Sequence, residues 1–229
     1  MRRGDVRIHY LDRLPDGPAP VLVVPGYAEP AEEYGWLLSA LAPRRALAVS
    51  VRGRGQSDAP PTGYRWEDHV EDVEAVVEDA RLDRVAVISI SRGTAYALGF
   101  ALRHPDRVRA LVIGDYQARH VGLAPAWAEH SLTDQIRSVP VTSRMPVHAV
   151  RGVQQESVEV PLWDRLAELR CPILLIRGGR PSSLVPDEAL ERYQRSLPGL
   201  EVVTITSAGH DLWSRDQARF VEIVTAFLR

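Results

Sequence analysis

The stretch RVAVISISRGTAYALGFALR, residues 84–103, decides the fold of this chain. It begins with a continuous apolar run, residues 85–88, which is typical of a strand buried in the middle of a parallel sheet. It ends with residues 94–103, which are rich in Ala and Leu and predict a helix. A buried strand that passes through a short turn into a helix is one βα unit of an α/β fold.

The same alternation of strand and helix continues on both sides of this unit. Strands are predicted at residues 6–11, 20–24, 45–51, 108–113, 171–176 and 200–205. Helices are predicted at residues 34–41, 66–80, 187–197 and 217–228. Together they predict a mostly parallel central sheet with helices on both faces, within one domain that spans residues 1–229.

One segment, Tyr116–Val160, breaks the alternation. It contains Pro125, Pro140 and Pro146, and no apolar run in it predicts a buried strand. We therefore expect a small cap insertion at about residues 116–160 that lies over one edge of the sheet.

Composition excludes several classes of protein. The chain has 28 basic and 30 acidic residues, a net charge of −2, which argues against a protein that coats nucleic acid or an anionic membrane. One cysteine permits neither an intrachain disulfide nor a cysteine-based zinc cluster. No apolar stretch reaches the length of about 18 residues that spans a membrane, and residues 1–7 have no signal-peptide pattern. We expect a cytoplasmic protein.

Ser91 is the first candidate for chemistry, because it lies on the predicted strand-to-helix turn. Such a turn pushes a serine hydroxyl out of the sheet, and the next backbone N–H, of Arg92, points to where an oxyanion would form. The Pro25-Gly26 turn after another strand would aim the N–H of Tyr27 at the same point. The structural alternative is that Ser89 or Ser91 only caps the helix.

His210 is the second candidate. It lies in a loop after the predicted strand at residues 200–205, and parallel sheets bind ligands at the carboxyl ends of their strands. A histidine there is well placed to act as a general base. The alternative is an ordinary histidine of a surface loop.

These motifs together resemble the α/β-hydrolase superfamily along nearly the whole chain. Pro25-Gly26-Tyr27 is similar to its oxyanion turn, and residues 52–57, RGRGQS, are similar to its Arg-Gly-x-Gly-x-Ser loop. Ser91 matches the nucleophile and His210 the catalytic histidine. The chain departs from the family at Ser89, where the nucleophile motif usually has glycine. The resemblance implies an α/β-hydrolase fold with no metal or organic cofactor.

The orienting acid of the triad is the larger departure. Family members mostly carry it after the strand that here is predicted at residues 171–176, where no carboxylate precedes Asp187. Some carry it one strand earlier, and Asp115 stands at that place. The resemblance thus implies a triad of Ser91, His210 and Asp115, with Asp187 as the second candidate. The structural alternative is that Asp115 only caps the following segment.

The cap is expected to line the pocket for a small-molecule acyl substrate, free or carrier-bound. The candidate substrate-binding residues are Gly26, Tyr116, Arg119, His120 and Trp127. Arg119 and His120 follow Asp115 closely and have the chemistry to bind a carboxylate or phosphate. Alternatively they pair with Glu129, Asp134 or Glu156 on the surface.

Three functions fit these residues. The first is a serine hydrolase that cleaves an ester or thioester. The second is an acyltransferase with the same triad, which moves an acyl group from a carrier thioester to an alcohol or amine. The third is a ligand-binding protein without activity. Dehalogenase chemistry is disfavoured, because it needs a carboxylate where Ser91 stands. Peroxidase chemistry with a serine triad stays open.

Overall fold

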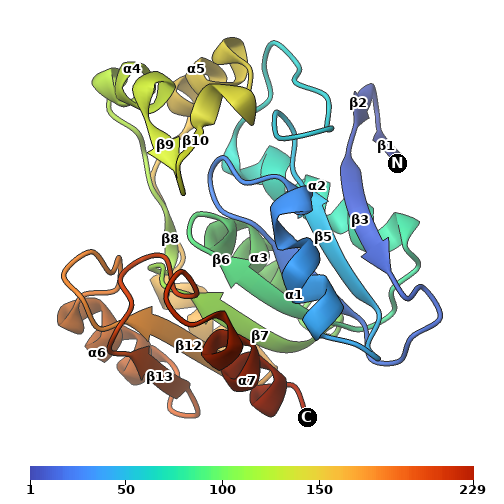
Figure 1. Ribbon diagram of the computed structural model, residues 1–229, viewed down its shortest axis with the longest axis vertical. Coiled ribbons are helices and arrows are strands. Elements are labelled where there is room, and N and C mark those ends of the chain that lie inside the picture. Colours follow the sequence, from blue (N-terminus) through green and yellow to red (C-terminus); the bar gives the residue numbers. More distant parts are fainter.

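The computed structural model describes all residues, 1–229, and its centre is a seven-stranded sheet (Figure 1). The strand order is β13-β12-β7-β6-β4-β5-β3, and only β3 runs antiparallel to its neighbour. The strands of this sheet are β3 (His9–Arg13), β4 (Val21–Val24), β5 (Ala46–Ser50), β6 (Val85–Ile90), β7 (Val108–Gly114), β12 (Ile173–Gly178) and β13 (Glu201–Ile205). The expected α/β architecture with a mostly parallel sheet is confirmed.

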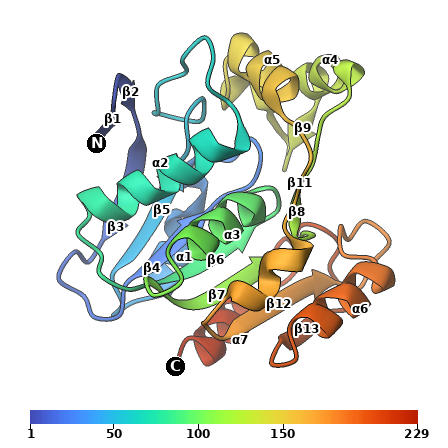
Figure 2. The ribbon, with the colours of Figure 1, turned by 180° about the vertical axis from the view of Figure 1, so that it is seen from behind.

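Helices cover both faces of the sheet (Figures 1 and 2). One face carries α1 and α7, and the other carries α2, α3, η3 and α6. The helices of the two layers are η1 (Ala31–Tyr34), α1 (Gly35–Ala40), α2 (Trp66–Asp79), α3 (Gly93–Arg103), η3 (Trp163–Glu168), α6 (Asp187–Ser196) and α7 (Gln217–Phe227). Because the central strands are buried on both faces, alternate residues of each strand enter two separate cores. Val87 belongs to the core under α3, and Ile88 to the core under α1 and α7.

The predicted strand ends shift by a few residues. The strand expected from residue 171 begins at Ile173, because Pro172 has no N–H to donate to the sheet. The carbonyl of Pro172 still accepts from the N–H of Leu111 at 3.0 Å. Near the amino terminus, two-residue strands β1 (Arg2–Arg3) and β2 (Val6–Arg7) form a small hairpin. No helix combines the length and the apolar character that crossing a bilayer requires.

The segment expected to be a cap forms a small layer of its own. Its elements are β8 (Arg119–His120), α4 (Pro125–Thr133), β9 (Gln135–Ile136), β10 (Val139–Pro140), η2 (Val141–Ser143), α5 (Val147–Glu156) and β11 (Val160–Pro161). Figures 1 and 2 show α4 and α5 beyond one end of the sheet. The edge that this layer covers is the one formed by the carboxyl ends of the strands. The short strands β8 and β11 pair antiparallel where the chain enters and leaves the segment.

Close packing holds this cap on the loop that follows β5. A β-carbon added at Gly152 of α5 would lie 2.5 Å from the ring of Tyr64, so the backbone of α5 rests directly on that ring. The carboxylate of Glu156 accepts from the N–H groups of Gly63, at 3.0 Å, and Tyr64, at 2.9 Å. The cap is therefore fixed over the sheet edge by both packing and hydrogen bonds.

Candidate active site

Ser91 lies on a sharp turn between β6 and α3. Its φ is +52°, a left-handed conformation that is costly for a residue with a β-carbon. Gly93 allows the turn to pack against the end of β4, because a β-carbon there would lie 2.2 Å from the carbonyl oxygen of Pro25. Ser89, the departure from the family motif, is buried in β6, and its hydroxyl donates to the carbonyl of Val112 at 2.9 Å. The serine side chain is thus accommodated inside the sheet.

Neither serine caps the helix. The residue at the amino-terminal cap of α3 is Arg92, and no side chain makes a capping hydrogen bond there. The hydroxyl of Ser91 lies instead 2.9 Å from Nε2 of His210. The alternative that Ser89 or Ser91 serves only as a helix cap is therefore wrong.

His210 connects Ser91 to Asp115. Its Nδ1 lies 2.9 Å from Oδ2 of Asp115, on the opposite side of the ring from Ser91. The His210 side chain is 34% exposed, whereas the Asp115 side chain is fully buried. A hydroxyl, an imidazole and a carboxylate in this order can activate the hydroxyl as a nucleophile.

Three further donors hold the carboxylate of Asp115. Oδ1 accepts from the N–H of Gly178 at 3.0 Å and from the hydroxyl of Ser183 at 2.5 Å, and Oδ2 accepts from the N–H of Leu184 at 2.9 Å. Burial acts to raise the pKa of Asp115, but the hydrogen bonds from His210 and these donors outweigh it and lower the pKa below its usual value. The carboxylate is therefore kept ionised beside the imidazole.

Asp187, the second candidate for the acid, lies elsewhere. Its side chain is 86% exposed at the start of α6 and pairs with Nη1 of Arg177 at 2.8 Å. It makes no contact with His210. The idea that Asp115 only caps the following segment is also wrong, because its carboxylate binds the loop after β12 and His210.

The backbone N–H groups of Tyr27 and Arg92 donate to no acceptor in the protein, and both residues lie beside Ser91. They are thus available to an oxyanion. Gly26 differs, because its N–H donates to the carboxylate of Glu29 at 2.7 Å. A β-carbon at Gly26 would lie 2.6 Å from that carboxylate and 3.2 Å from Cβ of Ser91, so the glycine permits the close approach of the two loops.

The prediction that His120 binds substrate is wrong. The residue is fully buried in the stem of the cap, which is the pair of short strands β8 and β11. Its Nε2 accepts from Nη2 of Arg92 at 2.6 Å. Its Nδ1 lies 2.9 Å from the carbonyl of Val158 and therefore carries the ring proton. Burial and the Arg92 guanidinium lower the pKa of His120 to about 3, which keeps the ring neutral. Its role is to connect the side chain of Arg92 to the cap.

Arg119 does not reach the substrate pocket either. Its guanidinium lies 3.7 Å from Glu159, across the β8–β11 pair, and the residue lines neither of the two cavities beside Ser91. Glu129, one of the partners considered for it, pairs with Arg151 instead, at 3.1 Å. Alternate residues of β8 point to opposite sides, which sends His120 inward and Arg119 outward.

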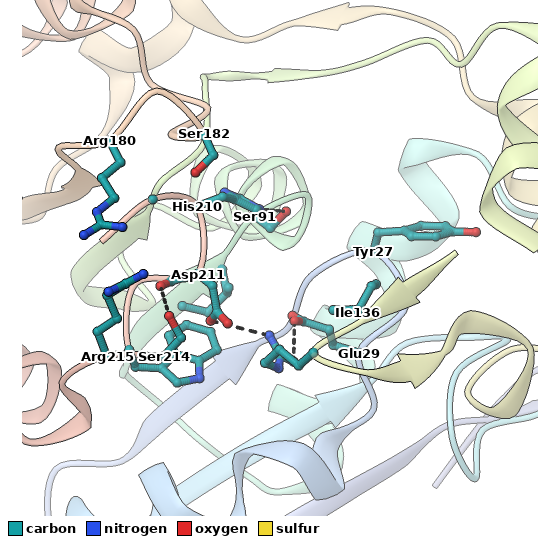
Figure 3. A pocket seen from close by; sticks show the side chains of 14 residues that line it. Tyr27, Glu29, Ser91, Ile136, Arg180, Ser182, His210, Asp211, Ser214 and Arg215 are labelled. Carbon is teal, nitrogen blue, oxygen red and sulfur yellow. Dashed lines mark hydrogen bonds and ion pairs between the residues drawn. The ribbon is translucent and has the colours of Figure 1, made fainter. Parts of the chain in front are cut away.

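Two cavities meet at Ser91 and His210. The first has a volume of about 460 Å³, and Figure 3 shows its polar lining. The second has a volume of about 380 Å³ and is lined mainly by apolar side chains of the cap. Tyr116 and Trp127, both predicted to bind substrate, line the second cavity. The ring of Trp127 packs edge-on against Tyr27 at 4.6 Å between centroids.

Several residues of the first cavity were not identified from the sequence. They are Glu29, Arg180, Ser182, Asp211, Ser214 and Arg215. Their positions at the carboxyl ends of β4, β12 and β13 were the available signal, since ligands gather at that edge. Which of these side chains turn toward Ser91 depends on loop conformations that a single sequence does not define.

Comparison with known proteins gives a consistent family. The sequence model of the alpha/beta hydrolase fold matches residues 19–124. A relative from Mesorhizobium japonicum, 2-(acetamidomethylene)succinate hydrolase, is 26% identical over 72% of this chain and 71% of its own length. An esterase structure from Exiguobacterium antarcticum superimposes with a TM-score of 0.81, at 17% identity, over 97% of this chain and 96% of that chain. An esterase from Rhodococcus sp. ECU1013 superimposes with a TM-score of 0.81, at 20% identity, over 99% and 96% of the two chains.

Proposed function

This chain is a member of the α/β-hydrolase superfamily, and from that premise we propose that it is a serine hydrolase that cleaves an ester or thioester acyl bond. The observation that carries the proposal is the hydrogen-bonded chain from Ser91 through His210 to Asp115, with 2.9 Å at each link. Ser91 is the nucleophile, His210 the general base and acid, and Asp115 the orienting acid.

The first half of the reaction forms an acyl-enzyme. Oγ of Ser91 attacks the carbonyl carbon of the substrate while Nε2 of His210 takes the hydroxyl proton. The negative charge that develops on the carbonyl oxygen is met by the free N–H groups of Tyr27 and Arg92; one such donor contributes about 10²- to 10³-fold to the rate in comparable enzymes. When the tetrahedral intermediate collapses, the alcohol or thiol leaves with the proton from His210.

The second half of the reaction releases the acid. A water molecule gives a proton to Nε2 of His210 and attacks the acyl carbon. When the second tetrahedral intermediate collapses, the bond to Oγ of Ser91 breaks, His210 returns the proton to that oxygen, and the carboxylic acid leaves. Through both halves, the carboxylate of Asp115 faces Nδ1 of His210, fixes the ring orientation and stabilises the imidazolium.

Hydrolysis is favoured over transfer to another acceptor by the exposure of the site. An acyltransferase with this triad has to keep water away from its acyl-enzyme. The His210 side chain is 34% exposed and lines both cavities with Ser91, so the site is open to water. A ligand-binding protein without activity would have no need for the chain of hydrogen bonds at Ser91, and a dehalogenase would need a carboxylate in its place.

Labelling with a fluorophosphonate tests the proposal. We expect intact-protein mass spectrometry to detect one adduct on the wild-type protein and none on Ser91→Ala. Ser39→Ala, which changes an exposed serine of α1, is the matched control and should label like the wild type. The wild-type protein should also turn over simple aryl esters, and Ser91→Ala should not. A folded wild-type protein that neither labels nor turns over any ester would refute the proposal.

A further inference from the structure

Two arginines of the first cavity have no partner in the protein. Arg180 follows β12 and Arg215 precedes α7, and both line the cavity together with Ser91 and His210. Neither guanidinium takes part in any hydrogen bond or ion pair. Figure 3 shows the two side chains on the same side of the cavity, with their guanidinium groups toward each other. Both residues are exposed and line one cavity, so an anion bound there would meet two positive charges.

The acidic side chains of the cavity do not neutralise these arginines. The carboxylate of Glu29 lies 2.6 Å from Nη2 of Arg137, and Oδ1 of Asp211 lies 3.9 Å from Nη1 of the same guanidinium. Both carboxylates therefore face Arg137, and neither makes an ion pair with Arg180 or Arg215. With three arginines and two carboxylates, the lining keeps an excess of one positive charge, which an anionic ligand would neutralise.

A hydroxyl completes the group of free donors. Ser182 lines the same cavity, and its hydroxyl makes no hydrogen bond within the protein. A β-carbon added at Gly209 would lie 2.0 Å from Oγ of Ser182, so this hydroxyl lies directly over the residue before His210. The hydroxyl of Ser214 is different, because it donates to the backbone carbonyl of Asp211 at 3.0 Å.

From these residues, and given the proposed function, we infer that the first cavity binds a carboxylate of the substrate. The natural ester or thioester then carries a free carboxylate in addition to the bond that is cleaved. Arg180 and Arg215 bind its two oxygens, and Ser182 donates a third hydrogen bond. A carboxylate with one charge suits the cavity better than a doubly charged phosphate, because Glu29 and Asp211 lie on the same wall.

Paired esters test this inference by turnover. Mono-4-nitrophenyl adipate and its methyl ester differ only by a carboxylate on the acyl side, and 3-acetoxybenzoate and its methyl ester differ by one on the alcohol side. We expect the wild-type protein to prefer the anionic member of at least one pair by about 10-fold or more in kcat/KM, after subtraction of the enzyme-free rate. The preference should decline as salt is raised, because the arginines are exposed.

Substitution separates the subsite from the catalytic residues. The double variant R180Q/R215Q should lose the preference for the anionic ester, because its kcat/KM on that ester should fall toward its kcat/KM on the neutral one. R195Q, an exposed arginine of α6, is the control and should keep the preference. A wild-type protein that turns over both members equally, or an R180Q/R215Q variant that keeps the preference, overturns the subsite and leaves the proposed hydrolase intact. A phosphate-bearing ester that is turned over faster than the carboxylate overturns the assignment of the ligand.

A binding measurement covers the case in which no ester of the panel is turned over. By calorimetry, Ser91→Ala should bind mono-4-nitrophenyl adipate more tightly than its methyl ester. Each arginine removed from Ser91→Ala should weaken the affinity for the adipate about tenfold. Equal affinity for the two esters, or no loss in R180Q/R215Q, overturns the inference without reference to catalysis. Absence of fluorophosphonate labelling, by contrast, concerns only the proposed function.

Discussion

Ser91 and Asp115 share an unusual backbone conformation. Their φ values are +52° and +48°, although each has a β-carbon, and such residues are held at a cost of roughly 1 to 3 kcal/mol. Both follow adjacent strands of the sheet, where Ile90 pairs with Gly114. The N–H of Ser91 donates to Gly114 at 2.9 Å, and the N–H of Asp115 donates to Ile176 at 2.8 Å. The neighbouring strand thus holds each strained residue and directs its side chain out of the sheet.

Asp115→Asn tests the acid at this scale. We expect turnover to fall by about 10³- to 10⁴-fold, because an amide does not stabilise the imidazolium and favours the wrong ring tautomer. Asp187→Asn is the matched control and should change turnover less than about twofold. Steady-state kinetics with an aryl ester and a thermal melt of each variant provide the comparison. A larger loss in Asp187→Asn would reverse the assignment.

The catalytic candidates could be predicted from the sequence because Ser91 and Asp115 directly follow a strand and His210 lies in the loop after one. Ser91, Asp115 and His210 are close in space for a topological reason, which is that parallel strands bring their carboxyl ends to one edge. Arg180 and Arg215 lie at the same edge, but long side chains on loops reach in directions that the pattern does not determine. His120 was misassigned because nearness to Asp115 in sequence does not show on which side of β8 its ring lies.

The cap shows, at the scale of an element, how a short hairpin can connect two layers. Arg137 and Ser138 form the two-residue turn between β9 and β10, with φ values of +48° and +62°. Two left-handed residues in this position indicate a type I′ turn, which usually contains Asn or Gly. The turn places the guanidinium of Arg137 2.6 Å from Glu29 and 2.7 Å from Glu33, both on the segment that follows β4. Burial acts against the charge, but these carboxylates raise the pKa of Arg137 above its usual value.

Arg137→Gln should loosen the cap. Glu29 is buried and would lose its cation, so we expect the free energy of unfolding to fall by about 3 kcal/mol, as measured by urea denaturation. The control is Arg151→Gln in α5, whose partner Glu129 is exposed, and we expect it to cost less than about 1 kcal/mol. Limited proteolysis should cut within residues 121–146 of Arg137→Gln first. Equal losses in the two variants would show that Arg137 does not hold the cap.

The strands of the central sheet and the helices α1, α2, α3, α6 and α7 were predictable because their periodicity is local, whereas α4 and α5 of the cap were not predicted. The strands β8 and β11 were not, since each has only two residues and exists through pairing between His120 and Val160, which are 40 positions apart. The hairpin of β9 and β10 was not predictable either, because its turn lacks the usual Asn or Gly. Ion pairs from Arg137 to distant residues offset the cost of the left-handed turn conformation.

At the scale of the whole molecule, two buried histidines are paired with two buried arginines around Tyr96. Nη1 of Arg54 lies 2.8 Å from Nε2 of His69, and Nη2 of Arg92 lies 2.6 Å from Nε2 of His120. The ring of His69 stacks on Tyr96 at 4.6 Å, and His120 lies at 6.0 Å on the same ring. Burial and the guanidinium groups lower the pKa of both histidines. This cluster joins the loop after β5, the helices α2 and α3, and the β8–β11 pair at the base of the cap.

Stability should therefore fall under mildly acidic conditions. The unfolded chain binds protons at these histidines below a pH of about 6.5, whereas folded His120 resists protonation down to a pKa of about 3. The contribution of His120 to the free energy of unfolding is fully present above the unfolded pKa and is lost as the pH falls toward the folded pKa of about 3. Between pH 7 and pH 5 this loss is about 2 kcal/mol. His69 acts in the same direction. Asp115 contributes only at lower pH, since its folded pKa lies below its usual value.

Urea denaturation at pH 7, 6 and 5 measures this slope. His120→Gln removes one of the titrating groups, so its stability should decline less steeply with pH than that of the wild type, whatever its stability at pH 7. His130→Gln, an exposed histidine of α4, should leave the slope unchanged. Equal slopes for the wild type and His120→Gln would contradict the proposed linkage.

The pairing of β8 with β11 has a consequence for how such a protein changes over evolution. Because His120 and Val160 face each other, the inserted segment begins and ends at nearly the same point of the core. Closing a loop between neighbouring ends costs free energy that grows only slowly with loop length, by about 0.6 kcal/mol per doubling. Recombination can therefore exchange, shorten or extend the segment between them as one cassette. The reacting groups would be inherited unchanged, while the shape of the apolar cavity diverges from lineage to lineage.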